Sequence, residues 1–185
     1  HQNTYSGGTD AFLVKFSSVG DRSWGTYYGG TALDNGFACA VDVNDNAYLV
    51  GLTVSTADIA YQGYQNILGG MRDAFLVKFN GAGQREWGTY YGGSQSDDGF
   101  DCTIDPDNNV YLTGPAASPS SIAVTGHQNT FGGMSDAFLV KFGCGGDTDG
   151  DGIADCEDDC PNTPGEIGSP CDDDQSNTLS DMVGA

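Results

Sequence analysis

Positive charge is scarce in this sequence. The 185 residues carry six Lys and Arg against 26 Asp and Glu, which gives a formal net charge of −20 at pH 7. No Lys or Arg follows Lys141, and 12 of the acidic residues lie in residues 143–185. Nucleic acid and anionic membrane surfaces would repel such a chain, so neither is expected as a partner, whereas cations are its natural complement.

Long apolar runs and helical periodicity are also missing. No stretch approaches the roughly 20 apolar residues that span a bilayer as a helix, so no membrane insertion is expected. The first residues show no signal-peptide pattern, and His1 falls partway through a repeat. We therefore expect the chain to be a segment of a longer protein.

The six cysteines fall into two groups. Cys39 and Cys102 alternate with apolar residues, so both side chains are expected to face the interior, one repeat apart and too distant for a disulfide. The other four lie in a Gly-, Asp- and Pro-rich end and are candidates for disulfides of an oxidising, extracellular compartment. They are Cys144, Cys156, Cys160 and Cys171. Their three possible pairings stay open.

An exact internal repeat dominates the first 142 residues. The string DAFLVKF begins at Asp10, Asp73 and Asp136, at intervals of 63 residues. WGTYYGG recurs from Trp24 to Trp87 at the same offset, with no insertion or deletion between the copies. A register held over so many positions indicates a structural period, and it divides the chain into residues 1–142 and 143–185.

Each period predicts four strands and no helix. The strands expected in the first copy are residues 10–16, 22–30, 36–43 and 46–53, and DAFLVKF is apolar on both of its alternating faces. Residues 44–46 and 107–109 are Asn and Asp, which tolerate the positive φ of hairpin turns. Residues 53–70 predict a long connecting loop. Four short antiparallel strands covered on both faces predict an all-β fold of β-propeller blades, with a β-solenoid as the alternative.

The repeat resembles a known family. The combination of QNxxGGxxDAFLVKF (QNxxxGGxDAFLVKF in the first copy), WGTYYGG and a D-x-x-x-N-x-Y-L-x-G hairpin is similar to the bacterial SBBP-type β-propeller repeat, over residues 1–142. This resemblance implies an extracellular repeat module without assigned chemistry.

Two whole periods and one further strand are too few for a ring, because closed propellers have about four to eight blades. Either the parent protein supplies further blades, or identical chains assemble into a ring or filament, with the strand around Phe138 completing a neighbour's blade.

Residues 147–158, DTDGDGIADCED, have the spacing of a calcium-binding loop. Counted from Asp147, carboxylates occupy positions one, three, five, nine and twelve, with a glycine at six and a backbone carbonyl at seven. The expected ligands are Asp147, Asp149, Asp151, Ile153 through its carbonyl, Asp155 and Asp158. A disordered acidic linker is the alternative.

This stretch resembles the thrombospondin type 3 repeat from Asp147 to Pro161, which implies a structural calcium held by short loops. A second, weaker cluster resembles the Cys-Asp-Asp-rich motifs near the C-termini of large secreted bacterial surface proteins. It comprises Asp172, Asp174, Asn177 and Asp181. For this cluster, calcium binding and a plain turn both stay open.

No catalytic constellation stands out. His1 and His127 occupy equivalent repeat positions, with Tyr64 between them, and are expected to belong to the framework. Carboxylates present in one copy are Glu86, Asp98 and Asp101, for which solvated surface is the expected role. Trp24 and Trp87 could stack on sugars, but packing between neighbouring blades is the expected use of aromatics repeated in register.

The sequence therefore predicts a calcium-stiffened, extracellular structural or adhesive protein of a bacterial cell surface, without enzymatic activity. Its partners would be calcium ions, further blades or identical chains, and a surface glycan or protein. A carbohydrate-binding propeller is the first alternative, and a polysaccharide-degrading enzyme is the second.

Overall fold

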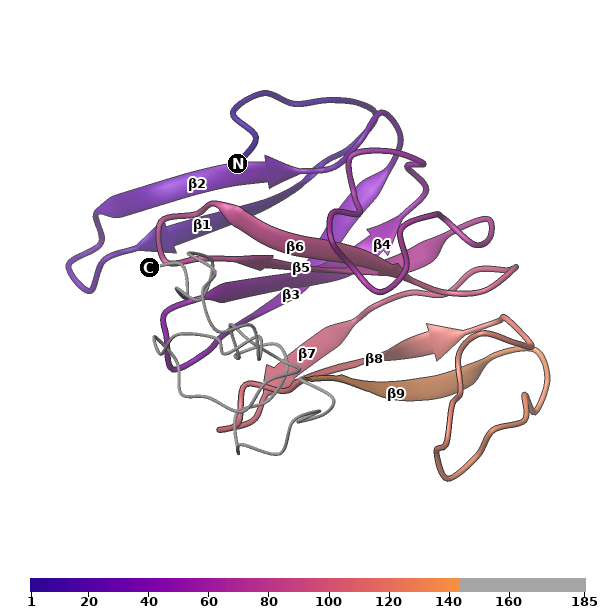
Figure 1. Ribbon diagram of the computed structural model, residues 1–185. Coiled ribbons are helices and arrows are strands. Elements are labelled where there is room, and N and C mark those ends of the chain that lie inside the picture. The colour runs from indigo at the N-terminus through magenta and orange to yellow at the C-terminus, as the bar shows by residue number, and fades with distance from the viewer. Residues whose placement is uncertain (144–185) are drawn as a thin grey trace, which may run out of the picture. The chain divides into compact units, whose positions relative to one another are not determined.

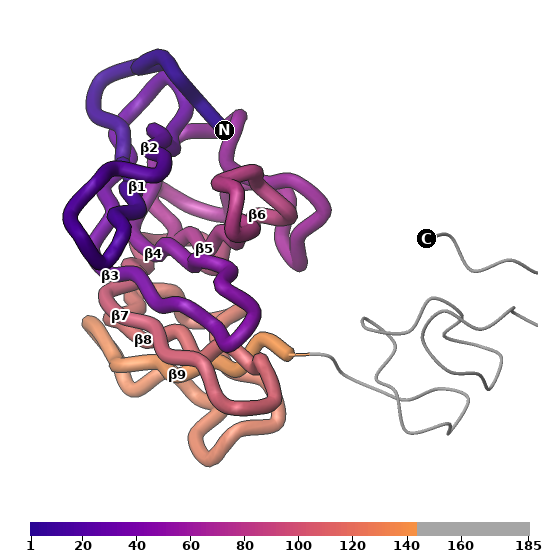
Figure 2. The backbone as a smooth tube through the Cα atoms, turned by 90° about the vertical axis from the view of Figure 1, so that its left-hand side faces the viewer, coloured from indigo at the N-terminus to yellow at the C-terminus, as the bar shows by residue number. Residues whose placement is uncertain are grey.

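The computed structural model describes residues 1–143, and this part of the chain contains strands and no helix (Figure 1). The all-β fold expected from the sequence is confirmed. Figure 2 shows the chain passing through three sheets in order. Sheet 1 is β1 (Ala11–Phe16) and β2 (Arg22–Tyr28); sheet 2 is β3 (Asp34–Val41), β4 (Ala47–Thr53), β5 (Asp73–Phe79) and β6 (Arg85–Tyr91); sheet 3 is β7 (Asp101–Ile104), β8 (Val110–Ala116) and β9 (Asp136–Phe142). Within residues 1–143 no helix could cross a membrane.

The local predictions hold. All neighbouring strands within a sheet are antiparallel, and the tight turns after β3 and β7 place Asp45 and Asn108 at φ 67° and 61°. An Asp42 carboxylate oxygen accepts hydrogen bonds from the backbone N–H of Asn44 and Asn46, both at 2.9 Å, and so shapes the first of these turns. The long loop between β4 and β5 covers residues 54–72.

The grouping of strands into sheets differs from the prediction. We expected the four strands of one period to form one sheet, but the four-stranded sheet combines β3 and β4 of the first period with β5 and β6 of the second. After β2 the chain passes through the Gly29–Gly30 pair into a new sheet. Gly30 leaves no room for a side chain, because a Cβ there would lie 2.4 Å from the Ala57 carbonyl oxygen. Within the described residues, the strand around Phe138, β9, pairs with β8 of its own chain, and whether it also completes a sheet of a neighbouring chain stays a prediction.

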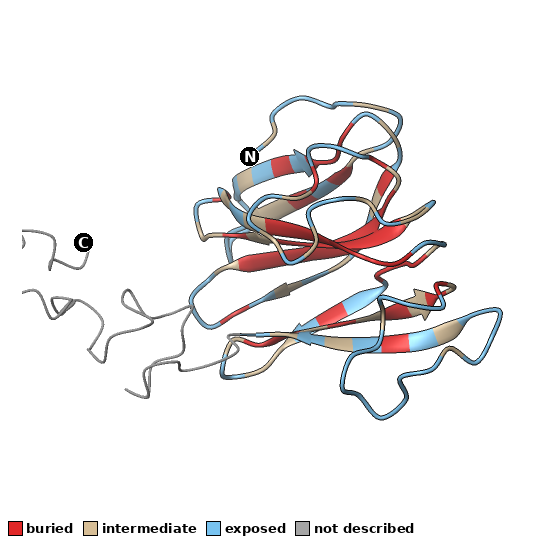
Figure 3. Cartoon of the chain, turned by 45° about the vertical axis from the view of Figure 1, so that its right-hand side comes forward, coloured by how far each residue is buried: buried red, intermediate tan, exposed pale blue. Residues whose placement is uncertain are grey.

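The same heptapeptide has three different environments. In β1, DAFLVKF buries Ala11 and Leu13 and exposes Phe12; in β5 all residues except Lys78 are buried; in β9 Phe138 is buried and Leu139 is exposed. Figure 3 shows this contrast, with sheet 2 the most continuously buried of the three. An apolar side chain gains stability only when another surface covers it, so sheet 2 is stabilised by its two neighbours.

Two apolar cores join the sheets. The first packs Leu13 and Tyr28 of sheet 1 against Phe75, Val77 and Phe79 of sheet 2. The second has the same construction one repeat later, with Leu76 and Tyr91 of sheet 2 against Phe138 and other residues of sheet 3. Each sheet therefore presents its Leu face to the next sheet and its Phe face to the preceding one.

The end sheets leave one apolar face uncovered. Phe12 and Phe16 of sheet 1 are 67% and 61% exposed, whereas their counterparts Phe75 and Phe79 are fully buried. Cys39 also lies exposed, which corrects the expectation that it faces the interior. It pairs with Leu49 on the face of sheet 2 that is directed toward sheet 1, and sheet 1 has no counterparts of β3 and β4 among the described residues.

Repeat-equivalent phenylalanines give a matched test of this packing. Phe75→Ala should lower the free energy of unfolding by about 3–5 kcal/mol, because it opens a cavity between sheets 1 and 2. Phe12→Ala makes the same chemical change at an exposed position and should change it by about 0.5 kcal/mol or less. Urea unfolding followed by tryptophan fluorescence measures both, and equal losses would contradict the packing described.

Candidate functional site

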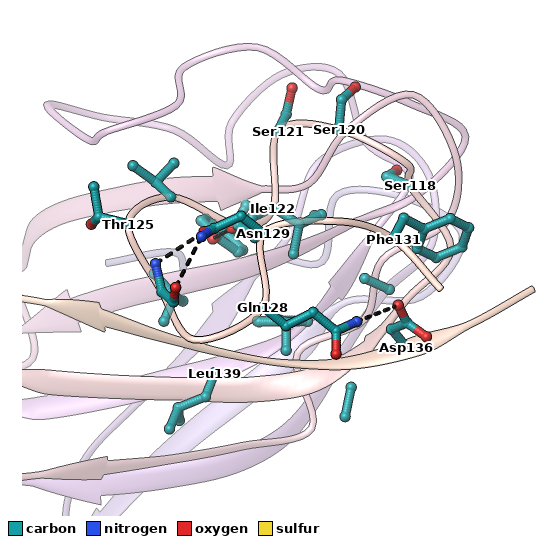
Figure 4. A pocket seen from close by; sticks show the side chains of 18 of the residues that line it. Ser118, Ser120, Ser121, Ile122, Thr125, Gln128, Asn129, Phe131, Asp136 and Leu139 are labelled. Atoms are coloured by element: carbon teal, nitrogen blue, oxygen red, sulfur yellow. Dashed lines mark hydrogen bonds between the residues drawn. The ribbon is translucent and has the colours of Figure 1, made fainter. Parts of the chain in front are cut away.

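One candidate site is a cavity of about 830 Å³ beside β9 (Figure 4). Its walls are the loop of residues 118–131, the strand β9, Tyr91 from β6 and Tyr64 from the loop between β4 and β5. The rings of Tyr91 and Phe138 lie 5.3 Å apart between their centroids, so the floor of the cavity is aromatic. The cavity therefore combines an apolar floor with the polar side chains and backbone of the loop.

Hydrogen bonds within the loop hold the polar side of the cavity. Asn129 forms a pair of bonds with Gly126, at 3.0 and 2.9 Å, and Gln128 donates to the Thr130 carbonyl at 3.0 Å. The Asp136 carboxylate accepts from the backbone N–H of Gly132 at 2.6 Å, and from the Gln128 amide at 3.4 Å, so it closes the loop.

Two acidic groups at this cavity, Tyr91 and Asp136, are held by contacts within the protein. Burial raises the pKa of Tyr91 to about 12, with Tyr64 and Asp97 adding smaller contributions, and its hydroxyl is already donated to the Ile122 carbonyl. The Asp136 carboxylate is occupied by the loop.

A second set of candidate groups consists of carboxylates buried at the corners between sheets. The Asp34 carboxylate accepts hydrogen bonds from the Gly30 N–H at 2.8 Å, the Ser55 hydroxyl at 2.7 Å and the Thr53 hydroxyl. Asp97, one repeat later, accepts from the Gly93 N–H at 2.8 Å and from Ser118. Both aspartates are fully buried, so each corner depends on its carboxylate. Sequence reasoning missed them, although the aspartate in G-G-x-x-x-D at the repeat offset was the available signal.

Asp73 is a buried carboxylate with incomplete hydrogen bonding. One oxygen accepts bonds from the Gly69 N–H at 2.7 Å and the Gln65 amide at 2.8 Å, but Oδ1 has no partner among residues 1–143. Burial raises the pKa of the Asp73 carboxyl, and the negative charge of Asp97 raises it further.

The single-copy carboxylates singled out from the sequence are engaged in other contacts. Glu86 forms an ion pair with Lys78 at 2.9 Å, and Asp98 forms a bidentate pair with Arg72, with an Nη2–Oδ2 distance of 2.8 Å. Asp101 is exposed, and its carboxylate accepts only the N–H of the next residue. None of the three lies beside a nucleophile or base within the described part of the chain.

The two tryptophans lie in contacts with protein. The Trp24 indole donates a hydrogen bond to the Gly81 carbonyl at 3.0 Å, and a Cβ on Gly83 would lie 2.8 Å from its ring. Sheet 1 thus contacts the β5–β6 turn of sheet 2. Trp87 packs edge-on against Tyr48, with centroids 6.0 Å apart. Both indoles are half-buried by these neighbours.

The repeat-equivalent rings of His1, Tyr64 and His127 lie at different sheets. His1 packs near Tyr28 and Phe79, at centroid distances of 6.0 and 5.9 Å, and Tyr64 packs near Tyr91 in the corresponding place. His127 lines the cavity beside β9. The structure does not bring the two histidines together as a pair.

No protein-family model matches the chain. The chain is similar to a WD repeat-containing protein. This relative is an uncharacterised protein, L264, of Acanthamoeba polyphaga mimivirus, and it is 27% identical over 122 residues. The match covers 60% of this chain but only 9% of the relative's length.

The predicted calcium ligands, the weaker acidic cluster and the four disulfide candidates all lie in residues 144–185, outside the described residues. Within residues 1–143, no group of three or more His, Cys, Asp or Glu side chains could hold a metal ion. Cys39 and Cys102 are free thiols. Burial raises the pKa of Cys102 to about 12, with Asp101 and Cys39 adding to the shift.

Replacing the buried carboxylates of Asp73 and Asp97 by neutral amides should change the stability of the protein in opposite directions. The folded-state pKa of Asp73 is raised above its ordinary value of 3.8, so its contribution to stability is present below that value and is lost as the pH rises through the raised pKa. Asp73→Asn should therefore become more stable relative to the unmodified protein between pH 3 and about 7. Asp97→Asn should destabilise the protein at neutral pH, by about 1–3 kcal/mol, because it disturbs a fully bonded corner.

Thermal unfolding across this pH range compares the two variants. A flat difference between Asp73→Asn and the unmodified protein would show that Asp73 is not held in a charge-disfavouring environment.

Proposed function

We propose that this chain is a segment of an extracellular structural or adhesive protein, in which β-propeller blades form a rigid module and a calcium-binding segment stiffens the stalk that links this module to the next domain. The observation that carries the proposal is the pair of matched apolar end faces. A module of this kind works by continuing into further units of the same type.

The propeller interpretation is supported by how the sheets meet. Sheet 2 has four antiparallel strands in sequence order, and its inner strands β4 and β5 are buried on both faces. The edge strands β3 and β7 contact each other, with Phe37 and Phe100 at a centroid distance of 5.4 Å. Blades that converge along such edge strands are typical of propellers, and the relative of this chain carries WD repeats in its name.

The role as a module is supported by the exposed faces. Sheet 1 exposes the Phe face that sheets 2 and 3 bury, and sheet 3 exposes Leu139, whose counterpart Leu76 is fully buried. Large exposed apolar surfaces mark interaction sites in soluble proteins. Further blades, from the parent protein or from identical chains, would cover them.

The calcium part of the proposal rests on the sequence of residues 147–158. Five carboxylates with a glycine at position six match the oxygen ligands that Ca²⁺ takes. The absence of basic residues after Lys141 leaves this charge without an internal counterion, so binding of divalent cations would relieve the repulsion. Disulfides among the four cysteines of the same segment would suit an extracellular compartment.

The first test is calcium binding by the full chain. Isothermal titration should detect binding with a dissociation constant on the order of 0.1–1 mM, the range of extracellular modules. Replacing Asp147, Asp149 and Asp151 by Asn should abolish this binding. Replacing Asp172 and Asp174 by Asn is the matched control, and it should retain the first site.

The second test measures whether calcium makes the chain more compact. Small-angle X-ray scattering of the full chain should give a smaller radius of gyration with calcium than with a chelator, and the triple Asn variant should show no calcium response. An unchanged radius in the unmodified protein, despite calcium binding, would contradict the proposed stiffening.

A further inference from the structure

The cavity beside β9 lies where sheet 3 has no fourth strand among residues 1–143. In sheet 2, β5 pairs with β4 on one side and β6 on the other, whereas its repeat-equivalent β9 pairs only with β8 among the described residues. The unpaired edge of β9 and the loop of residues 118–131 form the walls of the cavity. We call this space the strand groove.

Sheet 2 shows what the corresponding loop does when the fourth strand is present. Two isolated bridges fasten it to β6, between Tyr61 and Gly88 and between Gln65 and Tyr90. Ile59 of this loop is fully buried, whereas its counterpart Ile122 in sheet 3 is only half-buried. The loop beside β9 keeps the internal hydrogen-bond pair of its counterpart, between Gly126 and Asn129 as between Gly63 and Asn66, although no strand lies against it among residues 1–143.

A glutamine that recurs in each repeat forms hydrogen bonds with the strand that carries the W-G-T-Y-Y-G sequence. The Gln65 N–H donates to the Thr89 hydroxyl at 2.8 Å, its carbonyl accepts from the Tyr90 N–H at 3.0 Å, and its side-chain oxygen accepts from the Gly92 N–H at 3.2 Å. Gln2 makes the same three bonds to sheet 1, at 2.8, 3.1 and 3.1 Å. In sheets 1 and 2, therefore, the equivalent glutamine forms the same hydrogen bonds with a Thr-Tyr-Tyr-Gly segment.

Gln128 is the third copy of this glutamine, and half of its contacts are in place. Its amide donates to the Thr130 carbonyl at 3.0 Å, as Gln65 donates to the Ile67 carbonyl at the same distance. The groups that would bind Thr, Tyr and Gly of a fourth strand have no partner within the described residues. The Ser118 carbonyl is also available, and its counterpart on Ser55 accepts the Tyr90 hydroxyl at 2.8 Å.

The sequence of residues 143–185 contains no Phe, Tyr or Trp, so it does not carry the W-G-T-Y-Y-G pattern that both complete loops recognise. We propose that the strand groove binds an extended W-G-T-Y-Y-G-G segment donated by another polypeptide, which pairs antiparallel with β9 and completes sheet 3. This is strand addition to an open sheet edge, with the backbone giving affinity and the Thr and Tyr side chains giving specificity. The inference rests on the repeat-module part of the proposed function and is independent of calcium.

The probe is the peptide of residues 85–93, REWGTYYGG, labelled with a fluorophore and titrated with the full chain. Fluorescence anisotropy should show saturable one-to-one binding. The same peptide with Val in place of the threonine should bind about five- to tenfold more weakly, because it loses the hydroxyl that the glutamine backbone recognises.

Two protein variants locate the binding. Gln128→Ala changes an exposed side chain in the groove and should weaken binding by about tenfold or more. Gln65→Ala makes the same change at a glutamine whose strand is already present, so it should leave the affinity unchanged. In the NMR spectrum of the labelled chain, the amides of β9 and of residues 118–131 should shift on binding.

Three results would overturn the inference: no saturable binding up to millimolar peptide, equal affinity of the Gln128→Ala and unmodified chains, or amide shifts confined to β1 and β2. The last would place the peptide on the exposed Phe12 face instead. If the peptide does not bind but calcium still compacts the chain, the strand-binding inference is wrong, whereas the proposed module function is not contradicted.

Discussion

A β-sheet that is apolar on both faces is stable only between two other surfaces, and this constraint organises the described part of the chain. DAFLVKF occurs three times, but only the copy in β5 is covered on both sides. The Leu face of one sheet packs on the Phe face of the next, so the interfaces have a direction. Directional interfaces of this kind continue until a ring closes or a different surface ends the series.

The connections between sheets are as regular as the cores. Asp34 and Asp97 hold the corners through buried hydrogen bonds, and the Tyr28 and Tyr91 hydroxyls reach the loop of the following sheet. Because burial raises the pKa of both tyrosines, these hydroxyls remain protonated donors. The corners and the tyrosines fix the spacing of successive sheets, and the apolar faces supply most of the stability.

Much of this could be predicted from the sequence. Alternation and turn residues located the strands, and the Asn and Asp residues at positions 45 and 108 indicated the positive φ of the turns. The grouping into sheets could not be predicted, because a repeat with a 63-residue period has no marked beginning, and only the Gly30 turn and the Asp34 corner decide where one sheet ends. The exposure of Cys39 and the strand groove depend on which strands sheets 1 and 3 contain among residues 1–143, and no local sequence pattern predicts that. The predicted calcium and disulfide residues lie outside the described part.

Residue-resolved amide hydrogen exchange of the chain alone tests the central claim most directly. If each sheet depends on its neighbours, the amides of β4 and β5 should exchange slowest, and those of β1 and β9 should exchange at least about tenfold faster despite the identical sequence of β1, β5 and β9. Equal protection of these three strands would contradict the account, because each sheet would then be stable without a surface to cover it.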